Sequence, residues 1–315
     1  MLKRWLDSYA LITLKGMAMG AADVVPGVSG GTIAFITGIY ERLLLALKSF
    51  TPKALVILKR EGFAACWQHV DGTFLVSLFA GVLLSIAGLS HGIVYALENY
   101  PLQVWGFFCG LILAASVYIA RSLDLLHSKT LLAIGAGVLV ALLVAVLRPV
   151  DVPVNSVTVF LAGAIAICAM ILPGVSGSFL LLIMGMYPVI IQAVTELNLT
   201  ILSLFLGGCV LGLMAFSHVL YWLLQRFRQI TLGVLTGFLA GSLIIVWPWK
   251  RVVETRVDRH GEVVPVVQEN VWPWVYEAAS GSSSQWLEVT AMAVLGIVLV
   301  LVLEYVGGHA QKRDL

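Results

Sequence analysis

The sequence contains little charge. Only 11% of its 315 residues are Asp, Glu, Lys or Arg, whereas soluble domains carry about 25%. So few charged side chains cannot cover a water-facing surface, which excludes soluble enzymes, nucleic-acid-binding proteins and disordered proteins. The net charge of +2 gives no reason to expect a nucleic-acid partner. With 60% hydrophobic residues and a mean hydropathy of +0.99, the chain is predicted to be an integral membrane protein.

Cysteine is also scarce, and the few cysteines lie in or beside apolar stretches at spacings that do not suit a metal. They are Cys66, Cys109, Cys168 and Cys209. Free cysteines commonly pack as small hydrophobic residues, so we expect no metal site and no cofactor. A cleavable signal is missing too, because residues 1–15 lack a long apolar core ending in a small-residue cleavage site. We therefore expect the N-terminus to be retained.

Long apolar stretches predict an all-α polytopic membrane protein. A helix needs about 20 residues to cross the bilayer core. Six stretches meet this requirement: 73–97, 101–120, 130–147, 199–222, 230–247 and 286–306. Two further regions, 9–47 and 157–190, are too long for one crossing, and each is interrupted by Pro-Gly near its middle. We expect each of these two regions to form a re-entrant helical hairpin.

The distribution of Lys and Arg predicts the orientation, because cytoplasmic loops carry an excess of both. If the N-terminus is cytoplasmic and each hairpin returns to its own side, fourteen of the nineteen basic residues face the cytoplasm. These fourteen are Lys3, Arg4, Lys15, Arg42, Lys48, Lys53, Lys59, Arg60, Arg121, Lys129, Arg226, Arg228, Lys312 and Arg313. The other five are Arg148, Lys250, Arg251, Arg256 and Arg259. We therefore expect both termini to be cytoplasmic.

The long loop 248–285 is predicted to form a small cap outside the membrane. Its segments 251–257 and 263–267 are rich in β-branched residues and flank Asp-Arg-His-Gly at 258–261, a pattern typical of a β-hairpin. Two Trp-Pro-Trp triplets, at 247–249 and 272–274, bracket the loop. Trp prefers the membrane–water interface, so we expect this cap to rest on the lipid headgroups.

An internal repeat divides the chain into two halves, 1–150 and 151–315. The pentapeptide Pro-Gly-Val-Ser-Gly at 26–30 recurs at 173–177, and Gly and Tyr follow each copy at the same spacing. Each copy precedes three predicted spans, and by the charge distribution the two copies enter from opposite sides. The sequence therefore predicts two inverted-topology repeats, each a re-entrant hairpin plus three transmembrane helices. Secondary transporters often have this organisation, with the substrate near mid-membrane where broken helices meet.

The chemistry of the repeated motif favours an anion. Pro-Gly ends one helix, and the small polar residues after it open the next, where amides and hydroxyls point at a positive helix end. The hairpin tips are Pro26, Gly27, Pro173 and Gly174. The residues expected to bind an anionic group are Ser29, Gly30, Gly31, Thr32, Ser176, Gly177 and Ser178. The alternative interpretation is that both Pro-Gly units are only kinks.

Several polar residues within apolar stretches are further candidates. Asp23 lies three residues before the first Pro-Gly, where it would either bind a coupling proton or cation or cap free amides of the hairpin. Glu41 and Arg42 close the first hairpin, as a surface ion pair or as headgroup contacts. His218 is expected to be a histidine satisfied by one hydrogen bond rather than a proton relay, and His91 to be interfacial.

Glycines recur at four-residue spacing along two predicted spans, at positions 233, 237 and 241 and at positions 106 and 110. Small residues at this spacing are typical of close helix packing in lipid. We expect packing seams here, with a homodimer interface as the alternative.

The stretch from Met19 to Thr32, together with the later Pro-Gly-Val-Ser-Gly copy, resembles the bacterial polyprenyl-phosphate transporter family (PopT-type). The resemblance extends over nearly the whole chain, except that the 248–285 cap matches no motif of the family. It implies a multi-pass protein of the bacterial cytoplasmic membrane. Such proteins return undecaprenyl phosphate from the outer to the inner leaflet for reuse in cell-wall biogenesis. By resemblance, the Ser-Gly residues of both tips would hold the phosphate, and no covalent chemistry is expected.

Two other functions fit part of the sequence. A transporter of a small soluble anion would use the same helix ends. The Gly-x-Ser-x-Gly at 27–31 lacks the strand–turn–helix elbow of α/β-hydrolases, but an intramembrane serine hydrolase would use the Gly-x-Ser-Gly at 27–30, with His218 as its base. The duplication of the serine in both halves argues against a hydrolase, because one nucleophile requires only one copy.

Overall fold

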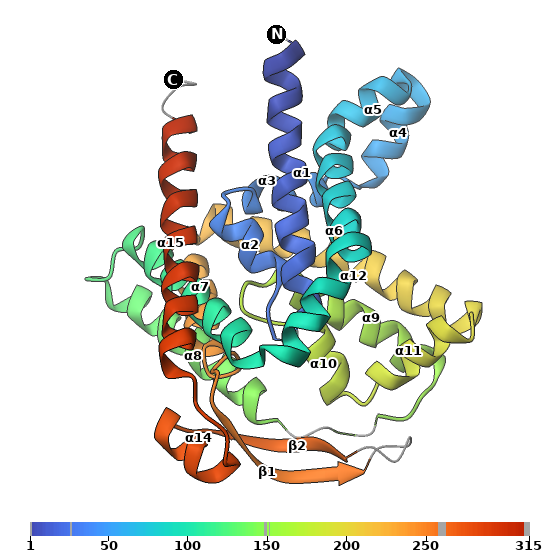
Figure 1. Ribbon diagram of the computed structural model, residues 1–315. Helices are drawn as coiled ribbons and strands as arrows, with labels where there is room; N and C mark the ends of the chain where they lie inside the picture. The colour runs from blue at the N-terminus through green and yellow to red at the C-terminus, as the bar shows by residue number, and fades with distance from the viewer. Residues whose placement is uncertain (1, 26, 148–149, 151, 258–262, 312–315) are drawn as a thin grey trace.

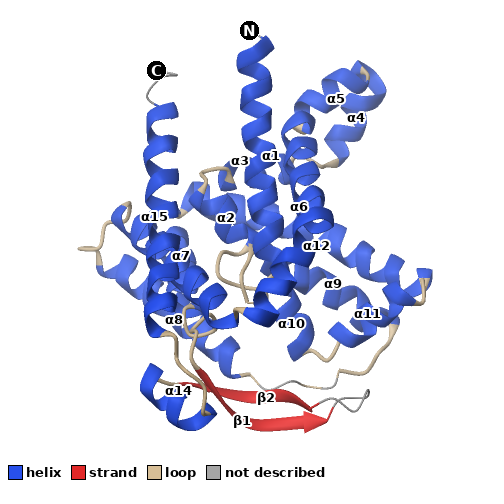
Figure 2. Ribbon diagram, in the orientation of Figure 1, coloured by secondary structure: helices blue, strands red, loops and turns tan. Residues whose placement is uncertain are grey.

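Helices form nearly all of the molecule, with one two-stranded sheet at one end (Figure 2). The computed structural model describes residues 2–25, 27–147, 150, 152–257 and 263–311. Expectations for Pro26, Arg148, the hairpin turn at 258–261, Lys312 and Arg313 lie outside these residues. Helix α1 begins and α15 ends at the end of the molecule opposite to the sheet (Figure 1).

Five of the six predicted spans are confirmed as helices that are long and apolar enough to cross a membrane. They are α6 (Gly72–Asn99), α7 (Pro101–Arg121), α8 (Ser128–Val146), α12 (Leu199–Arg226) and α15 (Trp286–Gln311).

The sixth predicted span is shorter than expected. Helix α13 (Arg228–Ser242) has 15 residues, or about 22 Å of rise, whereas the bilayer core is about 30 Å thick. The chain turns after Ser242, and Trp249 is then buried in a cluster with Leu102 and Val289. The sequence overestimated this span because its apolar run continues past the turn into residues that pack inside the protein.

Each long apolar region with a Pro-Gly forms three helices instead of one. The first region gives α1 (Leu2–Val24), α2 (Gly30–Ile36) and α3 (Tyr40–Lys48). The second gives α9 (Ser156–Ile171), α10 (Gly177–Ile183) and α11 (Tyr187–Thr195). The two short helices after each break are bent by 117° in the first region and by 107° in the second.

The backbone has the same conformation at the glycine of each break. Gly27 and Gly174 both have a φ of 81°, in the left-handed region that a side chain disfavours, and each ends a long helix. By the α2–α3 turn the chain has come back along α1, because the Lys15 ammonium donates to the carbonyl oxygen of Thr37 at 2.7 Å. Both breaks are therefore real interruptions followed by a change of direction.

Helix pairing also follows the repeat. Helix α1 packs along α6 (Figure 1) as α9 packs along α12, and α7 packs along α15 as α13 packs along α8. The last helix of residues 1–150, α8, therefore packs against a helix of residues 151–315, and the last helix of the chain, α15, packs against a helix of residues 1–150. The glycine seams lie inside this arrangement, since Gly110 meets the Ala293 carbonyl and Gly237 meets the Ile134 carbonyl. The predicted packing seams are confirmed as contacts within one chain.

Two insertions distinguish the halves. Helices α4 (Pro52–Glu61) and α5 (Phe63–His69) lie between α3 and α6 in the first half. The second half carries β1 (Lys250–Val257), β2 (Val263–Asn270) and α14 (Pro273–Ser280). The predicted hairpin is confirmed, because β1 and β2 pair antiparallel from Lys250 opposite Asn270 to Val257 opposite Val263.

The tryptophans that bracket the hairpin divide into two environments. Trp249 is buried and its indole N–H donates to the Ser284 carbonyl oxygen at 2.8 Å, so it fastens the hairpin to the helices. Trp272 and Trp274 are exposed and stack face to face, with ring centroids 5.5 Å apart. Only the second triplet exposes both of its tryptophans, as an interfacial position requires.

The close packing of α1 and α6 predicts the effect of one methyl group. A Cβ at Gly81 would overlap the Thr13 carbonyl oxygen, whereas a Cβ at Gly88 in the same helix would meet nothing within 4 Å. Overpacking typically costs about 1–3 kcal/mol, so we expect Gly81→Ala to lower the Tm of the detergent-solubilised protein by about 5 °C or more. Gly88→Ala is the matched control and should leave the Tm unchanged or raise it slightly, because Ala favours helix. Equal Tm values for the two variants would contradict this packing.

Candidate functional site

The two helix breaks meet at the centre of the molecule and hydrogen-bond to each other. The Ser29 hydroxyl donates to the Met170 carbonyl oxygen at 2.8 Å, and the Gly174 amide donates to the Thr32 hydroxyl oxygen at 3.0 Å. Ser29 and Thr32 are buried. Each break leaves backbone groups without helix partners, and the other half of the chain supplies those partners. The sequence analysis selected Ser29 and Thr32 but missed these cross-half contacts, because Met170 is apolar and only its carbonyl takes part.

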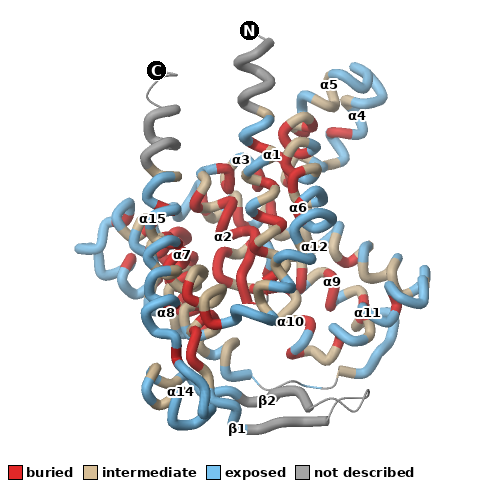
Figure 3. The backbone as a smooth tube through the Cα atoms, viewed as in Figure 1, coloured by how far each residue is buried: buried red, intermediate tan, exposed pale blue. Residues whose placement is uncertain are grey.

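The first break fits against the second only because Gly31 has no side chain. A Cβ there would lie 2.5 Å from the Ile171 carbonyl oxygen. Figure 3 shows α2 as the most continuously buried element at the centre of the fold. The Gly-Gly in the first motif is therefore a packing requirement at this point.

The amides of the first tip have partners within the protein. The Gly30 amide donates to Asp23 Oδ1 at 2.7 Å, and the Gly31 amide donates to Ser29 Oγ at 3.1 Å. The sequence argument expected these amides to be free for an anion, but here they are occupied. Asp23 accepts a hydrogen bond from an amide of the hairpin, as the capping interpretation predicted. Asp23 is also close enough to Gly30 that a Cβ on that glycine would touch its carboxylate.

The second tip is more open. Ser176 caps α10, its hydroxyl oxygen accepting from the Phe179 amide at 3.4 Å, and it lies 2.9 Å from the Ser178 hydroxyl. Within the described part of the chain, the amides of Gly177 and Ser178 have no acceptor. The repeat partner of Asp23 is Met170, so no carboxylate is available to cap this end. The second tip therefore carries two hydroxyls and two amides that lack an acceptor among the described residues.

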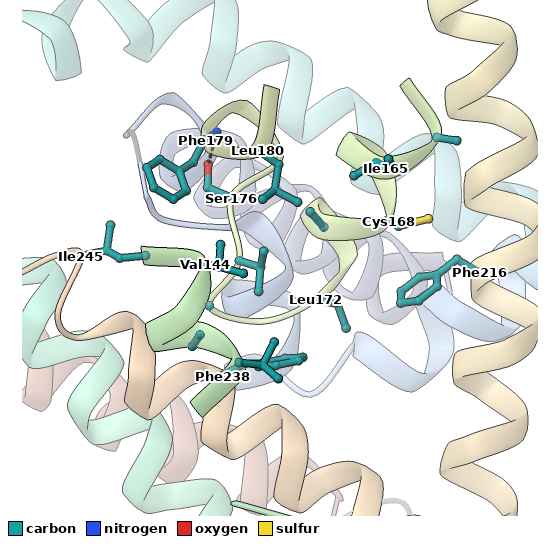
Figure 4. A pocket seen from close by; sticks show the side chains of 16 residues that line it. Val144, Ile165, Cys168, Leu172, Ser176, Phe179, Leu180, Phe216, Phe238 and Ile245 are labelled. Atoms are coloured by element: carbon teal, nitrogen blue, oxygen red, sulfur yellow. Dashed lines mark hydrogen bonds between the residues drawn. The ribbon is translucent and has the colours of Figure 1, made fainter. Parts of the chain in front are cut away.

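An apolar cavity of about 370 Å³ adjoins this second tip. Figure 4 shows Ser176, Phe179 and Leu180 on one side of it, with Phe238 and Ile245 on others. Its walls come from both halves of the chain and consist of Val140, Ala141, Val144, Ala164, Ile165, Cys168, Ala169, Leu172, Gly174, Val175, Ser176, Phe179, Leu180, Phe216, Phe238 and Ile245. Ser176 contributes its only hydroxyl. The cavity thus combines an almost entirely apolar wall with the one hydroxyl of Ser176 at the tip.

The remaining candidates lie away from the tips. Glu41 accepts from the Arg228 guanidinium at 2.7 Å, and Arg42 pairs with Asp71 through two contacts of 2.7 and 3.1 Å. Glu41 and Arg42 therefore pair with different partners, and each joins α3 to another segment.

His218 contacts its own helix, with Nδ1 2.7 Å from the Met214 carbonyl oxygen. This is the single hydrogen bond expected for it. The Ser29 hydroxyl donates to the Met170 carbonyl rather than to an imidazole, so the arrangement lacks the Ser–His pair that a hydrolase needs. Among the described residues, no three His, Cys, Asp or Glu side chains gather in a way that could hold a metal ion.

Comparison with known proteins agrees on one family. The family described as undecaprenyl phosphate translocase-like matches residues 19–264. A polyprenyl-phosphate transporter of Vibrio cholerae is 46% identical over 297 residues, which cover 94% of this chain and 96% of the relative. A polyprenyl-phosphate transporter of Staphylococcus aureus is 30% identical over 253 residues, covering 75% of this chain and 85% of the relative. No solved structure matches.

The contact between the tips predicts a specific loss of stability. Thr32→Val keeps the shape of the side chain but leaves the buried Gly174 amide without an acceptor, at a cost of about 1–3 kcal/mol. We expect this variant to lower the Tm in detergent by about 3 °C or more. The matched control is Thr236→Val, because Thr236 is equally buried and its hydroxyl only donates to the Leu232 carbonyl of its own helix. If both variants lose the same stability, the cross-half bond does not hold the tips together.

Proposed function

Because this chain belongs to the undecaprenyl phosphate translocase-like family, we propose that it carries a polyprenyl phosphate across a bacterial cytoplasmic membrane, from the outer to the inner leaflet. It is a transporter, and no covalent chemistry enters the proposed mechanism. The alternative is a secondary transporter of a small soluble anion.

The apolar cavity that ends at the second tip carries this proposal. An ionised phosphate cannot cross hydrocarbon without replacing its hydration. The hydroxyls of Ser176 and Ser178 and the amides of Gly177 and Ser178 would replace part of it, while the first isoprene units occupy the apolar cavity. A small soluble anion would need the polar end but would gain nothing from walls that are almost entirely apolar. The cavity therefore favours a lipid.

The repeated architecture supports transport by alternating access. We propose that the two halves are inverted repeats, and that α2–α3 and α10–α11 are the returning arms of two re-entrant hairpins. The matching bends and the exchange of last helices between halves support this proposal. Rocking of one half against the other would then expose the central tips to one leaflet at a time.

The first tip would take part in the other state of this cycle. In the present conformation Ser29 and Thr32 bind the second break and Asp23 occupies the Gly30 amide. Separation of the tips would release the hydroxyls of Ser29 and Thr32, and loss of the Asp23 and Ser29 contacts would release the amides of Gly30 and Gly31 to meet the phosphate. The headgroup would thus pass between two sets of the same residue types.

Inward movement of an anion opposes a negative-inside potential, at about 2.3 kcal/mol per charge per 100 mV. A co-transported proton or cation would offset this cost, and Asp23 is our candidate carrier. It is the acid at the break, and releasing the Gly30 amide would leave its carboxylate without that donor.

The test of the lipid-carrier function uses purified protein in liposomes that contain a polyprenyl phosphate, with its movement between leaflets as the readout. We expect the wild type to accelerate movement and Ser176→Ala to slow it about tenfold, because a hydrogen bond to a charged group contributes about 1.5–3 kcal/mol. Ser29→Ala should also slow movement, through the tip contacts. Ser116→Ala is the control, because its buried hydroxyl only donates to the Ile112 carbonyl of its own helix.

A second pair of variants in the same assay separates the lipid from the small anion. Val140 lines the apolar cavity and Leu139 beside it does not. Val140→Trp should block lipid movement, and Leu139→Trp should not. If wild-type protein moves no lipid under any ion gradient but accumulates a soluble anion, the lipid-carrier proposal is wrong.

Asp23→Asn separates the two roles of Asp23. Asn retains a side-chain oxygen that can accept from the Gly30 amide, so we expect the Tm to stay within about 2 °C of the wild type. It cannot carry a proton, so the response of lipid movement to an imposed pH or cation gradient should disappear. An unchanged response would leave capping as the only role of Asp23.

A further inference from the structure

A second cavity, of about 390 Å³, lies where the start of α3 meets the end of α7 and the turn between α12 and α13. It shares no lining residue with the apolar cavity, and it has five polar side chains in its wall: Tyr40, Glu41, Tyr118, Ser122 and Arg228. Arg121, Lys129 and Arg226 lie at the ends of the helices around it. It therefore opens among the basic residues that the charge distribution assigns to the cytoplasmic side.

Tyr40, which lines this cavity, carries a hydrogen-bond donor without a partner among the described residues. The residue is only 3% exposed, and its hydroxyl has no hydrogen-bond partner in the described part of the chain. Buried tyrosine hydroxyls normally find a partner, so an unpaired one in a residue that lines a cavity is a donor for a ligand that reaches it through a small side-chain movement.

Arg228 has a guanidinium that now pairs with Glu41 and that can pair with a phosphate instead. Its guanidinium lies 2.7 Å from the Glu41 carboxylate, and the two side chains are 55% and 46% exposed. Ion pairs as exposed as this one contribute little to stability. An arriving dianion can therefore displace Glu41, and the planar guanidinium suits two phosphate oxygens at once.

The second half has no copy of this arrangement. At the repeat offset Tyr40 corresponds to Tyr187, which is 41% exposed, and Glu41 corresponds to Pro188. The cavity is thus a feature of one side of the molecule only, as a site used at one end of a transport path would be.

We propose that this cavity binds the phosphate headgroup of the transported lipid on the side of the basic loops, with Arg228 and Tyr40 as donors and Glu41 as the displaced resident anion. The inference rests on the proposed function and adds a second headgroup site to it, apart from the central tips. Glu41 would limit the affinity, so that the headgroup is held briefly and then released to the leaflet.

The test measures binding of farnesyl phosphate to the full-length protein in detergent by titration calorimetry. All variants carry Ser176→Ala, so that the central tip contributes less to the signal. We expect Arg228→Gln to weaken binding about tenfold or more and Tyr40→Phe about fivefold, as for lost hydrogen bonds to a charged group. Glu41→Gln should tighten binding a few-fold, a change of opposite sign that general damage to the fold would not produce.

Two controls match these variants. Tyr187→Phe removes the corresponding hydroxyl of the second half, and Arg226→Ala removes a basic residue two positions away that does not line the cavity. Both should leave the affinity unchanged. The Tm of Tyr40→Phe should not fall, because the hydroxyl it removes has no partner within the protein.

Two results would overturn the inference. If wild-type protein moves lipid in liposomes but all three cavity variants bind farnesyl phosphate equally, the cavity is not a headgroup site and the proposed function stands. If inorganic phosphate shows the same pattern across the variants and farnesyl phosphate binds no tighter, the site serves a soluble phosphate. Absence of lipid movement by the wild type would then count against the proposed function as well.

Discussion

The fold depends on two hydrogen bonds between helix breaks that are more than 140 residues apart in the chain. A break inside an apolar environment exposes the last carbonyls of one helix and the first amides of the next, and no water is present to satisfy them. Here the Ser29 hydroxyl donates to a carbonyl oxygen at the end of α9, and the Thr32 hydroxyl oxygen accepts from the Gly174 amide. Neither half alone supplies these hydrogen-bond partners for its own break. The helices that exchange partners between halves, and the cavity walled by both, follow from this reciprocal arrangement.

The sequence predicts the repeated parts of this structure well, because they depend on local chemistry. Pro-Gly followed by Ser-Gly stops a helix, sets a left-handed glycine and caps the next helix, and it does so at Gly27 and Gly174 alike. The β-hairpin follows from its β-branched runs in the same way. Hydropathy alone did not reveal where α13 ends or that Trp249 is buried, because a membrane-facing and a protein-facing apolar residue look the same in one sequence.

The motif does not predict which amides and hydroxyls of the two tips have hydrogen-bond partners within the protein. Both copies share the same five residues, and the difference between them comes from their neighbours. Asp23 caps the first tip, while Met170 stands in its place in the second and presents only a carbonyl to Ser29. Tyr40 is buried and Tyr187 is exposed, although they too are repeat partners. Such differences arise from contacts between residues that are far apart in the sequence. A motif in one sequence does not predict these contacts.

This asymmetry bears on how the proposed transport cycle could be driven. If the two halves were chemically identical, exchanging their conformations would give a second state of equal energy and no built-in direction. In the proposed cycle the Asp23 contact would make the states unequal if the Gly30 amide must leave Asp23 to meet a phosphate, because Met170 at the repeat position gives the second tip no corresponding bond. An arriving phosphate would then face a carboxylate, a repulsion that a proton or cation on Asp23 would remove. We infer that opening of the first tip toward a phosphate and neutralisation of Asp23 favour each other, which is the thermodynamic linkage that ion-coupled transport requires.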